Sequence, residues 1–178
     1  MKKQRRVQFA SSSARSAAPL ELVHTDVWRP APISVKNGVR YFLTFIDDFS
    51  RKVWVYFMKK KSEVFIKFKM WKAEVEKETG WSLKCLRSDN GEEYTSKEFQ
   101  IFCEEYGIKR YFSVRGTQQN GVVERMNRIL MEKVRCMRLQ ARLFKVFWID
   151  TVDAACYLVN RSPHTKLDSG IQIGRAHV

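Results

Sequence analysis

Three acidic side chains stand where a fold could build a site for phosphoryl transfer. Asp26 and Asp89 each lie where a strand-like stretch ends and a polar stretch begins, and strand ends are where α/β sheets build their sites. Glu124 lies in the first turn of a predicted helix. Asn127 and Arg128 follow it by three and four positions, which puts all three side chains on one helix face. An acid, an amide and a base on one face would suit contact with phosphate.

Each of these residues also has a purely structural interpretation. Aspartate commonly ends strands, and the sequence from Asp89 to Gly91 is an ordinary turn. A glutamate at the start of a helix interacts favourably with the helix dipole and helps to cap the helix. The face that carries Asn127 and Arg128 is equally compatible with a solvated surface that holds an internal ion pair. Spacing alone leaves both interpretations open.

Divalent ions would make three separate carboxylates useful together. Mg²⁺ takes oxygen ligands and keeps positions for water and for a substrate phosphate. Two such ions, about 3.5–4 Å apart, activate an attacking oxygen and stabilise a leaving one. In a site of this kind we expect one aspartate to bridge both ions, while each of the other two carboxylates holds one side.

The elements that would position these residues follow from the hydrophobic periodicity. Runs rich in Val, Ile, Tyr, Phe and Trp predict strands at 20–28, 39–47, 52–58, 83–87 and 108–114. Three- and four-residue steps predict helices at 64–78, 97–106, 122–142 and 144–160. Gly80 and Gly107 end the first two helices, and Ser96 caps the second. We therefore expect an α/β fold with a mixed five-stranded sheet flanked by helices.

The connections and the charge balance add two expectations. Short links, including a hairpin-type turn at Lys36-Asn37-Gly38, predict that the first three strands form an antiparallel meander.

The 33 Lys and Arg residues against 19 Asp and Glu give a net charge of +14. This excess favours a polyanionic partner, nucleic acid before membrane, because basic side chains replace counterions along a phosphate backbone.

The cysteines predict a reducing, intracellular setting. They are widely spaced and include no C-x-x-C pair, and the three histidines are scattered. We therefore expect no structural zinc and no disulfide framework, but buried free thiols. The residues concerned are Cys85, Cys103, Cys136 and Cys156, with His24, His164 and His177.

The chain divides into three expected segments. Residues 1–18 read as a basic arm or linker, residues 19–168 as the core, and residues 169–178 as a non-native tail without function. The charged start at Met1 is followed by no apolar segment typical of a signal peptide. The most apolar stretch, Tyr41 to Ile46, is too short to span a bilayer, so no membrane partner is expected.

Several motifs together resemble the integrase core of copia-type LTR retrotransposon Pol polyproteins, of which this chain would be a fragment. The resemblance runs from about Pro19 to Ser162, with the motifs in the family's order. They are His24-Thr25-Asp26, the run from Tyr41 to Arg51, the run from Leu86 to Gly91, Gln118-Gln119-Asn120-Gly121, and Glu124-Arg125-Met126-Asn127-Arg128.

This resemblance implies an RNase H-like fold and a catalytic triad that binds two Mg²⁺ or Mn²⁺ ions. By position, Asp26, Asp89 and Glu124 would be that triad, serving as both catalytic residues and metal ligands. The family's reactions are 3′-end processing of element DNA and its strand transfer into target DNA, in the nucleus or a cytoplasmic particle, by multimers. The DNA contacts would be made by Gln118, Gln119, Asn120, Gly121, Asn127 and Arg128.

Four departures from the family pattern keep alternatives open. Arg29 and Glu92 stand where the family usually has glycine, Arg115 stands where it has proline, and a proline is missing before Gln118. Thirty-four residues therefore separate Asp89 from Glu124, one fewer than in the family. The first alternative is a catalytically inactive remnant that binds nucleic acid without joining it. The second is an RNase H-like nuclease of another kind, which would hydrolyse DNA without strand transfer.

Overall fold

The computed structural model describes residues 16–29, 38–113 and 121–162. The five strands are β1 (Val23–Trp28), β2 (Tyr41–Asp47), β3 (Val53–Met58), β4 (Cys85–Ser88) and β5 (Lys109–Phe112). The helices are α1 (Val64–Thr79), α2 (Glu92–Thr95), α3 (Lys97–Glu105), α4 (Gly121–Gln140) and α5 (Trp148–Arg161). Short 3₁₀ turns at Lys61–Glu63 and Lys145–Phe147 lead into α1 and α5.

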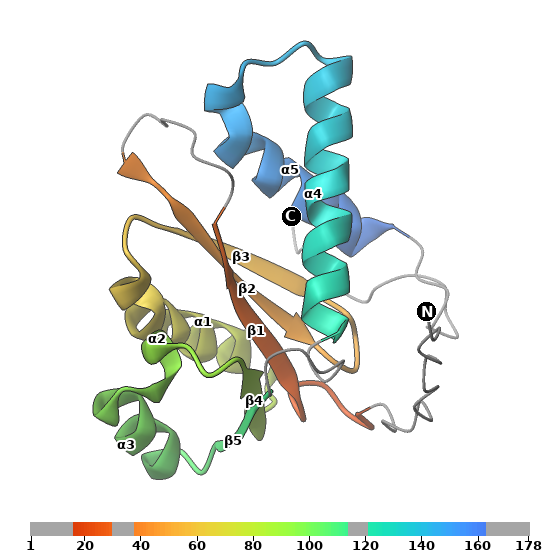
Figure 1. The fold of residues 1–178 in the computed structure, drawn as a ribbon. Coiled ribbons are helices and arrows are strands. Elements are labelled where there is room, and N and C mark those ends of the chain that lie inside the picture. The colour runs from red at the N-terminus through yellow and green to blue at the C-terminus, as the bar shows by residue number, and fades with distance from the viewer. Residues whose placement is uncertain (1–15, 30–37, 114–120, 163–178) are drawn as a thin grey trace, which may run out of the picture.

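The strands form one mixed sheet in the order β3-β2-β1-β4-β5 (Figure 1). β1 pairs antiparallel with β2, and β2 pairs antiparallel with β3, which confirms the predicted meander. β4 then joins β1 in parallel, and β5 joins β4 in parallel. The prediction of a mixed five-stranded sheet flanked by helices is therefore confirmed.

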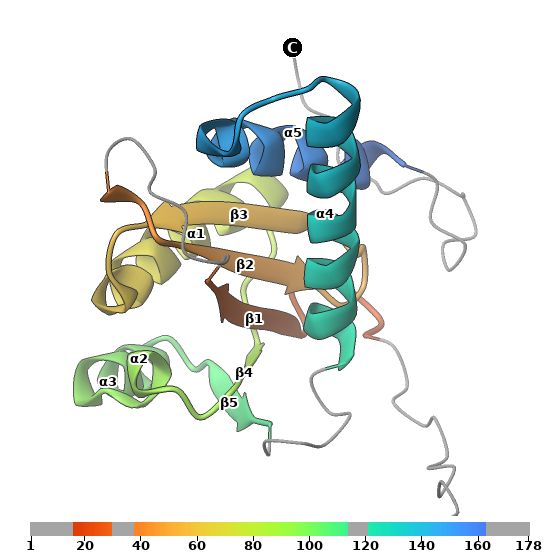
Figure 2. The same cartoon turned by 45° about the horizontal axis from the view of Figure 1, so that its top comes forward.

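Helices cover the two faces of the sheet unequally (Figure 2). One face carries a core in which Phe45 and Phe68 pack with Trp71, Tyr94 and Phe99, from β2 and from α1 to α3. The other face carries a core built by α4 and α5 against β2 and β3. Among the described residues, this second core includes none from β4 or β5. On this face, α4 and α5 therefore do not cover the strands β4 and β5.

Several local predictions can be compared with the structure. Gly80 ends α1 with a φ of +73°, and Ser96 caps α3 by accepting a hydrogen bond from the Phe99 backbone N–H, as expected. The short helix α2 was not predicted, because its four residues are too few to show a period. The 144–160 prediction began too early, since α5 starts at Trp148.

Other predictions were wrong or fall outside the described residues. Of the four cysteines expected to be buried free thiols, Cys103 and Cys156 are buried, Cys85 is half-buried, and Cys136 is exposed because it lies on the outer face of α4. Most of the predicted arm (1–15), the turn residues 36–37 and the predicted tail lie outside the described residues. In the parts of the chain that are described, no helix is both long and apolar enough to cross a lipid bilayer.

The turn between β2 and β3 anchors the start of β1 through a buried carboxylate. Asp47 accepts hydrogen bonds from the Leu20 backbone N–H at 2.9 Å and from the Ser50 backbone N–H at 2.8 Å. The Ser50 hydroxyl donates to the same carboxylate at 2.6 Å. Asp47 is thus the link that ties the segment leading into β1 to the β2–β3 turn.

The next residue, Asp48, makes a second set of contacts to the same region. Its carboxylate lies 3.2 Å from His24 Nε2 and 2.9 Å from Arg51 Nη1, and it accepts a hydrogen bond from the Ser16 backbone N–H. Burial alone would raise the pKa of Asp48, but the hydrogen bonds from His24 and Ser16 and the charge of Arg51 hold it well below its usual value. The buried acid pair therefore has a structural task.

Replacing Asp47 with alanine should destabilise the fold. The change leaves the buried Leu20 N–H without its acceptor, and an unsatisfied buried donor costs about 1–3 kcal/mol. We expect Asp47→Ala to lower the free energy of unfolding by about 3 kcal/mol, measured by urea denaturation. Ser50→Ala, which keeps the Leu20 contact, should cost about 1 kcal/mol. Equal losses in the two variants would contradict this assignment.

Candidate active site

Asp26 lies on β1 at the centre of the sheet, on the face that α4 covers. The side chains of a strand alternate between faces, so Asp26 shares its face with His24, while Val23 packs in the opposite core. Asn127 of α4 donates a hydrogen bond from Nδ2 to Asp26 Oδ2 at 3.0 Å. The carboxylate is thereby held between a strand and a helix that are 101 positions apart in the chain.

Asp89 follows the end of β4 and lies beside Asp26 because of the parallel pairing. His24 pairs with Arg87 across β1 and β4, and two further residues along each strand lead to Asp26 and Asp89. Asp89 Oδ1 accepts a hydrogen bond from the Gly91 backbone N–H at 3.1 Å, which shapes the turn after the strand. The register therefore sets the two aspartates side by side; Asp89 directly follows β4 as predicted, whereas Asp26 lies inside β1, two residues before its end.

Glu124 lies in the first turn of α4, the same helix whose Asn127 contacts Asp26. Val123 and Met126 on the same helix are buried in the second core, so the helix is fixed against the sheet. Glu124 itself is exposed, as is Arg128 one turn further along. Gly121 is the first residue of α4. The predicted DNA contacts Gln118, Gln119 and Asn120 lie outside the described residues.

The three carboxylates are close enough to act on one another electrostatically. The pKa of Asp26 is raised to about 6, first by burial and then by the negative charge of Asp89. The charge of Glu124 raises it further, whereas hydrogen bonds from the Val27 N–H and from Asn127 act in the opposite direction. The fold has thus gathered like charges at one place, at a cost in electrostatic energy.

The carboxylates are nevertheless not drawn into a closed cluster. Within residues 16–29, 38–113 and 121–162, no three His, Cys, Asp or Glu side chains stand close enough together to hold a metal ion. Three negative groups repel one another, so their mutual charge favours an open arrangement. An ion of opposite charge would supply the attraction that brings such groups together.

Asn127 has a different role from the one expected. It was predicted to contact DNA, but its side chain is fully buried and its amide N–H₂ donates to Asp26. Its Oδ1 atom has no hydrogen-bond partner among the described residues. Asn127 faces inward because it lies one turn after Val123, on the side of α4 that packs against the sheet. Its observed task is to orient Asp26.

Two further contacts around Asp89 were not found from the sequence. The Tyr94 hydroxyl lies 3.0 Å from Thr25 Oγ1, which ties α2 to β1 directly beneath the site. Lys61 Nζ lies 2.8 Å from Glu93 Oε1, and this glutamate side chain is only 7% exposed. A lysine and a glutamate 32 positions apart carry no recognisable spacing signal, so only the tertiary structure reveals this pair.

Residues 16–118, more than half of the chain, match the model of the integrase core domain. The chain belongs to the integrase core domain family. It is 54% identical over 166 residues to a retrovirus-related Pol polyprotein from transposon TNT 1-94 of Nicotiana tabacum, covering 93% of this chain. It is 33% identical over 162 residues to the Pol polyprotein from transposon RE2 of Arabidopsis thaliana, covering 90% of this chain. The resemblance to retrotransposon integrase cores is therefore confirmed.

This integrase core spans a small part of those curated relatives, 12% and 11% of their lengths. Its fold is similar to that of the HTLV-2 integrase catalytic core domain solved in complex with magnesium, with a TM-score of 0.64 and 22% identity. That likeness covers 89% of this chain and 96% of the other. A chain of a simian T-cell lymphotropic virus intasome gives a TM-score of 0.70 at 20% identity, over 89% and 54% of the two chains. The expected RNase H-like architecture of retroviral integrase cores is confirmed.

Neutralising Asp26 should stabilise the metal-free integrase core in a pH-dependent manner. Its pKa is about 6 in the folded chain against 3.8 for an ordinary aspartate, so the folded state binds the proton more tightly. The stability that this proton contributes is complete below about pH 4 and is lost as the pH rises through about 6. We expect Asp26→Asn to raise the unfolding free energy by roughly 2 kcal/mol at pH 7.5, measured in EDTA, and by almost nothing at pH 4.

The exposed Asp153 of α5 provides the control for this measurement. Asp153→Asn removes the same charge without relieving a buried carboxylate, so its effect should stay near zero across the pH range. An Asp26→Asn effect that did not change between pH 4 and pH 7.5 would show that Asp26 titrates normally.

Proposed function

We propose that this chain is the catalytic core of an integrase that joins retrotransposon DNA to target DNA. The observations that carry the proposal are the parallel register that sets Asp89 beside Asp26 and the raised pKa of Asp26, which burial causes first and to which the charges of Asp89 and Glu124 add. Carboxylates gathered against their own repulsion are typical of a functional site, because a purely structural position gains nothing from it. Membership of the integrase core family supplies the reaction class.

The proposed chemistry consists of two displacements at phosphorus. In 3′-end processing, a water oxygen attacks a phosphodiester near the end of the element DNA, the bond to the 3′ oxygen breaks, and a free 3′-OH remains. In strand transfer, that hydroxyl attacks a phosphodiester of the target, and the target's own 3′ oxygen leaves. Each step forms one P–O bond and breaks one; the attacking group releases a proton to solvent, and the departing 3′ oxygen takes one up to become a hydroxyl.

The carboxylates fit Mg²⁺ or Mn²⁺ by chemistry and by charge. Oxygen ligands are those that such ions prefer, and a divalent cation would relieve the repulsion that raises the pKa of Asp26. Asp26, Asp89 and Glu124 would hold the metal, with two ions in the active complex. The bound metal activates the attacking oxygen and stabilises the leaving one. Asn127 keeps the Asp26 carboxylate oriented, and Thr25 with Tyr94 fixes the strand beneath it.

The net charge supports DNA as a partner, and the solved forms of a similar core domain support a second copy of this chain. A net charge of +14 favours the DNA backbone, and Arg128 is exposed beside Glu124, where it would contact phosphate. The HTLV-2 core domain has been solved in dimeric and trimeric forms, and we propose that this chain also works as a homo-oligomer. Its reaction would take place in the nucleus or in an intracellular particle.

Two observations favour a second function. The described residues hold no closed group of metal ligands, and the segment between Asp89 and Glu124 is one residue shorter than in the family pattern. A displacement of about 1 Å in a catalytic group costs on the order of 100-fold in rate. The alternative is therefore an inactive remnant that binds nucleic acid and does not join it.

The joining reaction tests the leading proposal. A branched oligonucleotide that already holds a 3′-OH beside the target phosphodiester makes the step intramolecular, which removes the need to assemble two DNA molecules. With Mn²⁺ or Mg²⁺ we expect the chain to rejoin this substrate, and Asp89→Asn to reduce the rate by at least about 100-fold. Unchanged activity in Asp89→Asn would refute its role, and hydrolysis without rejoining would favour a nuclease.

Metal binding separates the integrase from the inactive remnant without requiring activity. At a Mg²⁺ concentration ten times its Kd, binding to the folded state should add about 1.4 kcal/mol and raise the Tm by a few degrees. Asp26→Asn and Asp89→Asn should abolish this shift, whereas Asp153→Asn should keep it. An inactive remnant would bind DNA in a salt-sensitive manner and show no Mg²⁺ shift.

A further inference from the structure

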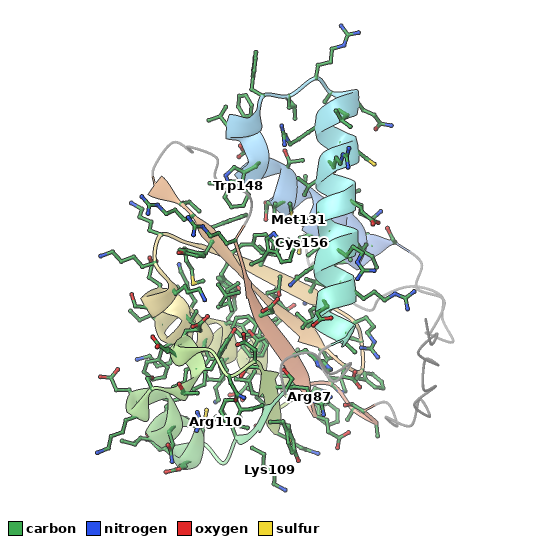
Figure 3. All side chains as sticks on the ribbon, in the orientation of Figure 1. Arg87, Lys109, Arg110, Met131, Trp148 and Cys156 are labelled. Atoms are coloured by element: carbon green, nitrogen blue, oxygen red, sulfur yellow. The ribbon has the colours of Figure 1, made fainter. Side chains whose placement is uncertain are left out.

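On the α4 face of the sheet, the strands β4 and β5 carry basic and aromatic side chains. Arg87 on β4 pairs in register with Tyr111 on β5, and Cys85 pairs with Lys109, so these four residues share one face. It is the face of Asp26 and α4, because Arg87 also pairs with His24 across β1. We call Arg87, Lys109 and Tyr111 the β4–β5 strip. Figure 3 shows Arg87 and Lys109 at the end of the sheet away from α5, with Lys109 pointing outward.

The strip is open to solvent. Tyr111 is 47% exposed although it lies in a sheet, and Lys109 is exposed beside it. Neither α4 nor α5 buries a residue of β4 or β5 among the described residues. Because α4 and α5 do not bury this face among the described residues, the exposed Tyr111 ring is accessible for stacking.

The charge of Arg87 is not neutralised by an acid. The described part of the chain has no carboxylate within 4 Å of either Arg87 or Lys109. By contrast, four other lysines have such partners: Lys52 with Glu78, Lys61 with Glu93, Lys72 with Glu76 and Lys84 with Glu21. The Arg87 guanidinium lies over the Tyr111 ring, 5.8 Å from its centroid. This contact orients the guanidinium, and its N–H groups donate to no acceptor among the described residues.

The strip leads directly to the carboxylates. Arg87 lies two residues before Asp89, on the same face of the sheet, and two residues of a strand span about 7 Å. The neighbouring Arg110 and Phe112 point to the opposite face, where Arg110 Nη1 donates to the Tyr94 carbonyl oxygen at 2.9 Å. The two basic residues of β5 therefore have separate tasks, and only Lys109 belongs to the strip.

We propose that the β4–β5 strip binds a single DNA strand as it enters the site, with a phosphate on Arg87, a base stacked on Tyr111 and a further phosphate near Lys109. This inference rests on the proposed function, since the strand is the substrate of that same site. A single strand fits better than a duplex, because a base offers its face for stacking only when it is unpaired. Basic and aromatic side chains side by side are the combination that single strands require.

The test measures binding without catalysis. The full chain is titrated, in EDTA, into a fluorescein-labelled 12-nucleotide single strand and into the matching duplex, and anisotropy is followed at several salt concentrations. We expect Tyr111→Leu to weaken single-strand binding about tenfold, and Tyr111→Phe, which keeps the ring, to bind like the wild type. Arg87→Gln should reduce the slope of log K against log salt by about 0.7, and Arg87→Lys should restore it.

A second arginine–tyrosine pair provides the matched control. On α5, which packs against β3 at the opposite edge of the sheet from β5, the Arg161 guanidinium lies 3.6 Å from the centroid of the exposed Tyr157 ring. Arg161→Gln and Tyr157→Leu should leave binding unchanged. Thermal unfolding of every variant is measured to check that its fold is intact.

The possible results distinguish a failure of the strip proposal from a failure of the proposed function. If the wild type binds and the Arg87 and Tyr111 variants behave like the α5 controls, the strip is wrong while DNA binding stands. The strip is also wrong if Tyr111→Leu weakens duplex and single-strand binding equally. If the wild type binds neither DNA, the proposed function fails for this chain, and the strip fails with it.

Discussion

The parallel pairing of β1 with β4 is the constraint on which the site depends. It sets the end of β4 beside the middle of β1. Asp26 and Asp89 therefore become neighbours, although the strands β2 and β3 and the helix α1 lie between them in the chain. Burial of β1 at the centre of the sheet then makes their mutual charge costly, as the raised pKa of Asp26 records. Backbone hydrogen bonds and two hydrophobic cores hold the strands in place against this repulsion.

The helix that carries Glu124 is fixed by a different kind of contact. Val123, Met126 and Leu130 bury one side of α4, and Asn127 on the same side reaches Asp26. A single polar contact within an apolar interface specifies the register of the helix over the sheet, because a slip would leave the buried Asn127 amide without its acceptor. The position of Glu124 above the aspartates is a consequence of that register.

Residues in a recognised motif need not all serve the same purpose. Asp47 and Asp48 belong to the stretch that resembles the integrase family, yet both are occupied with backbone amides, His24 and Arg51 around the β2–β3 turn. The candidate site acids accept fewer hydrogen bonds: Asp26 accepts from Asn127 and the Val27 N–H, and Asp89 accepts from the Gly91 N–H. Whether a carboxylate is satisfied by its own fold is thus the physical criterion that separates structural from functional acids.

Local patterns in the chain were enough to predict most of the elements and the family, and to propose the three carboxylates. Periodicity marked the strands and the long helices, because each repeats a local pattern, and the motifs around Asp26, Asp89 and Glu124 identified the family. Only the tertiary structure decided that Asn127 faces inward, that Lys61 pairs with Glu93 and that Arg87 stacks on Tyr111. These contacts depend on which strands become neighbours and which helix face is buried, and local spacing carries no record of either.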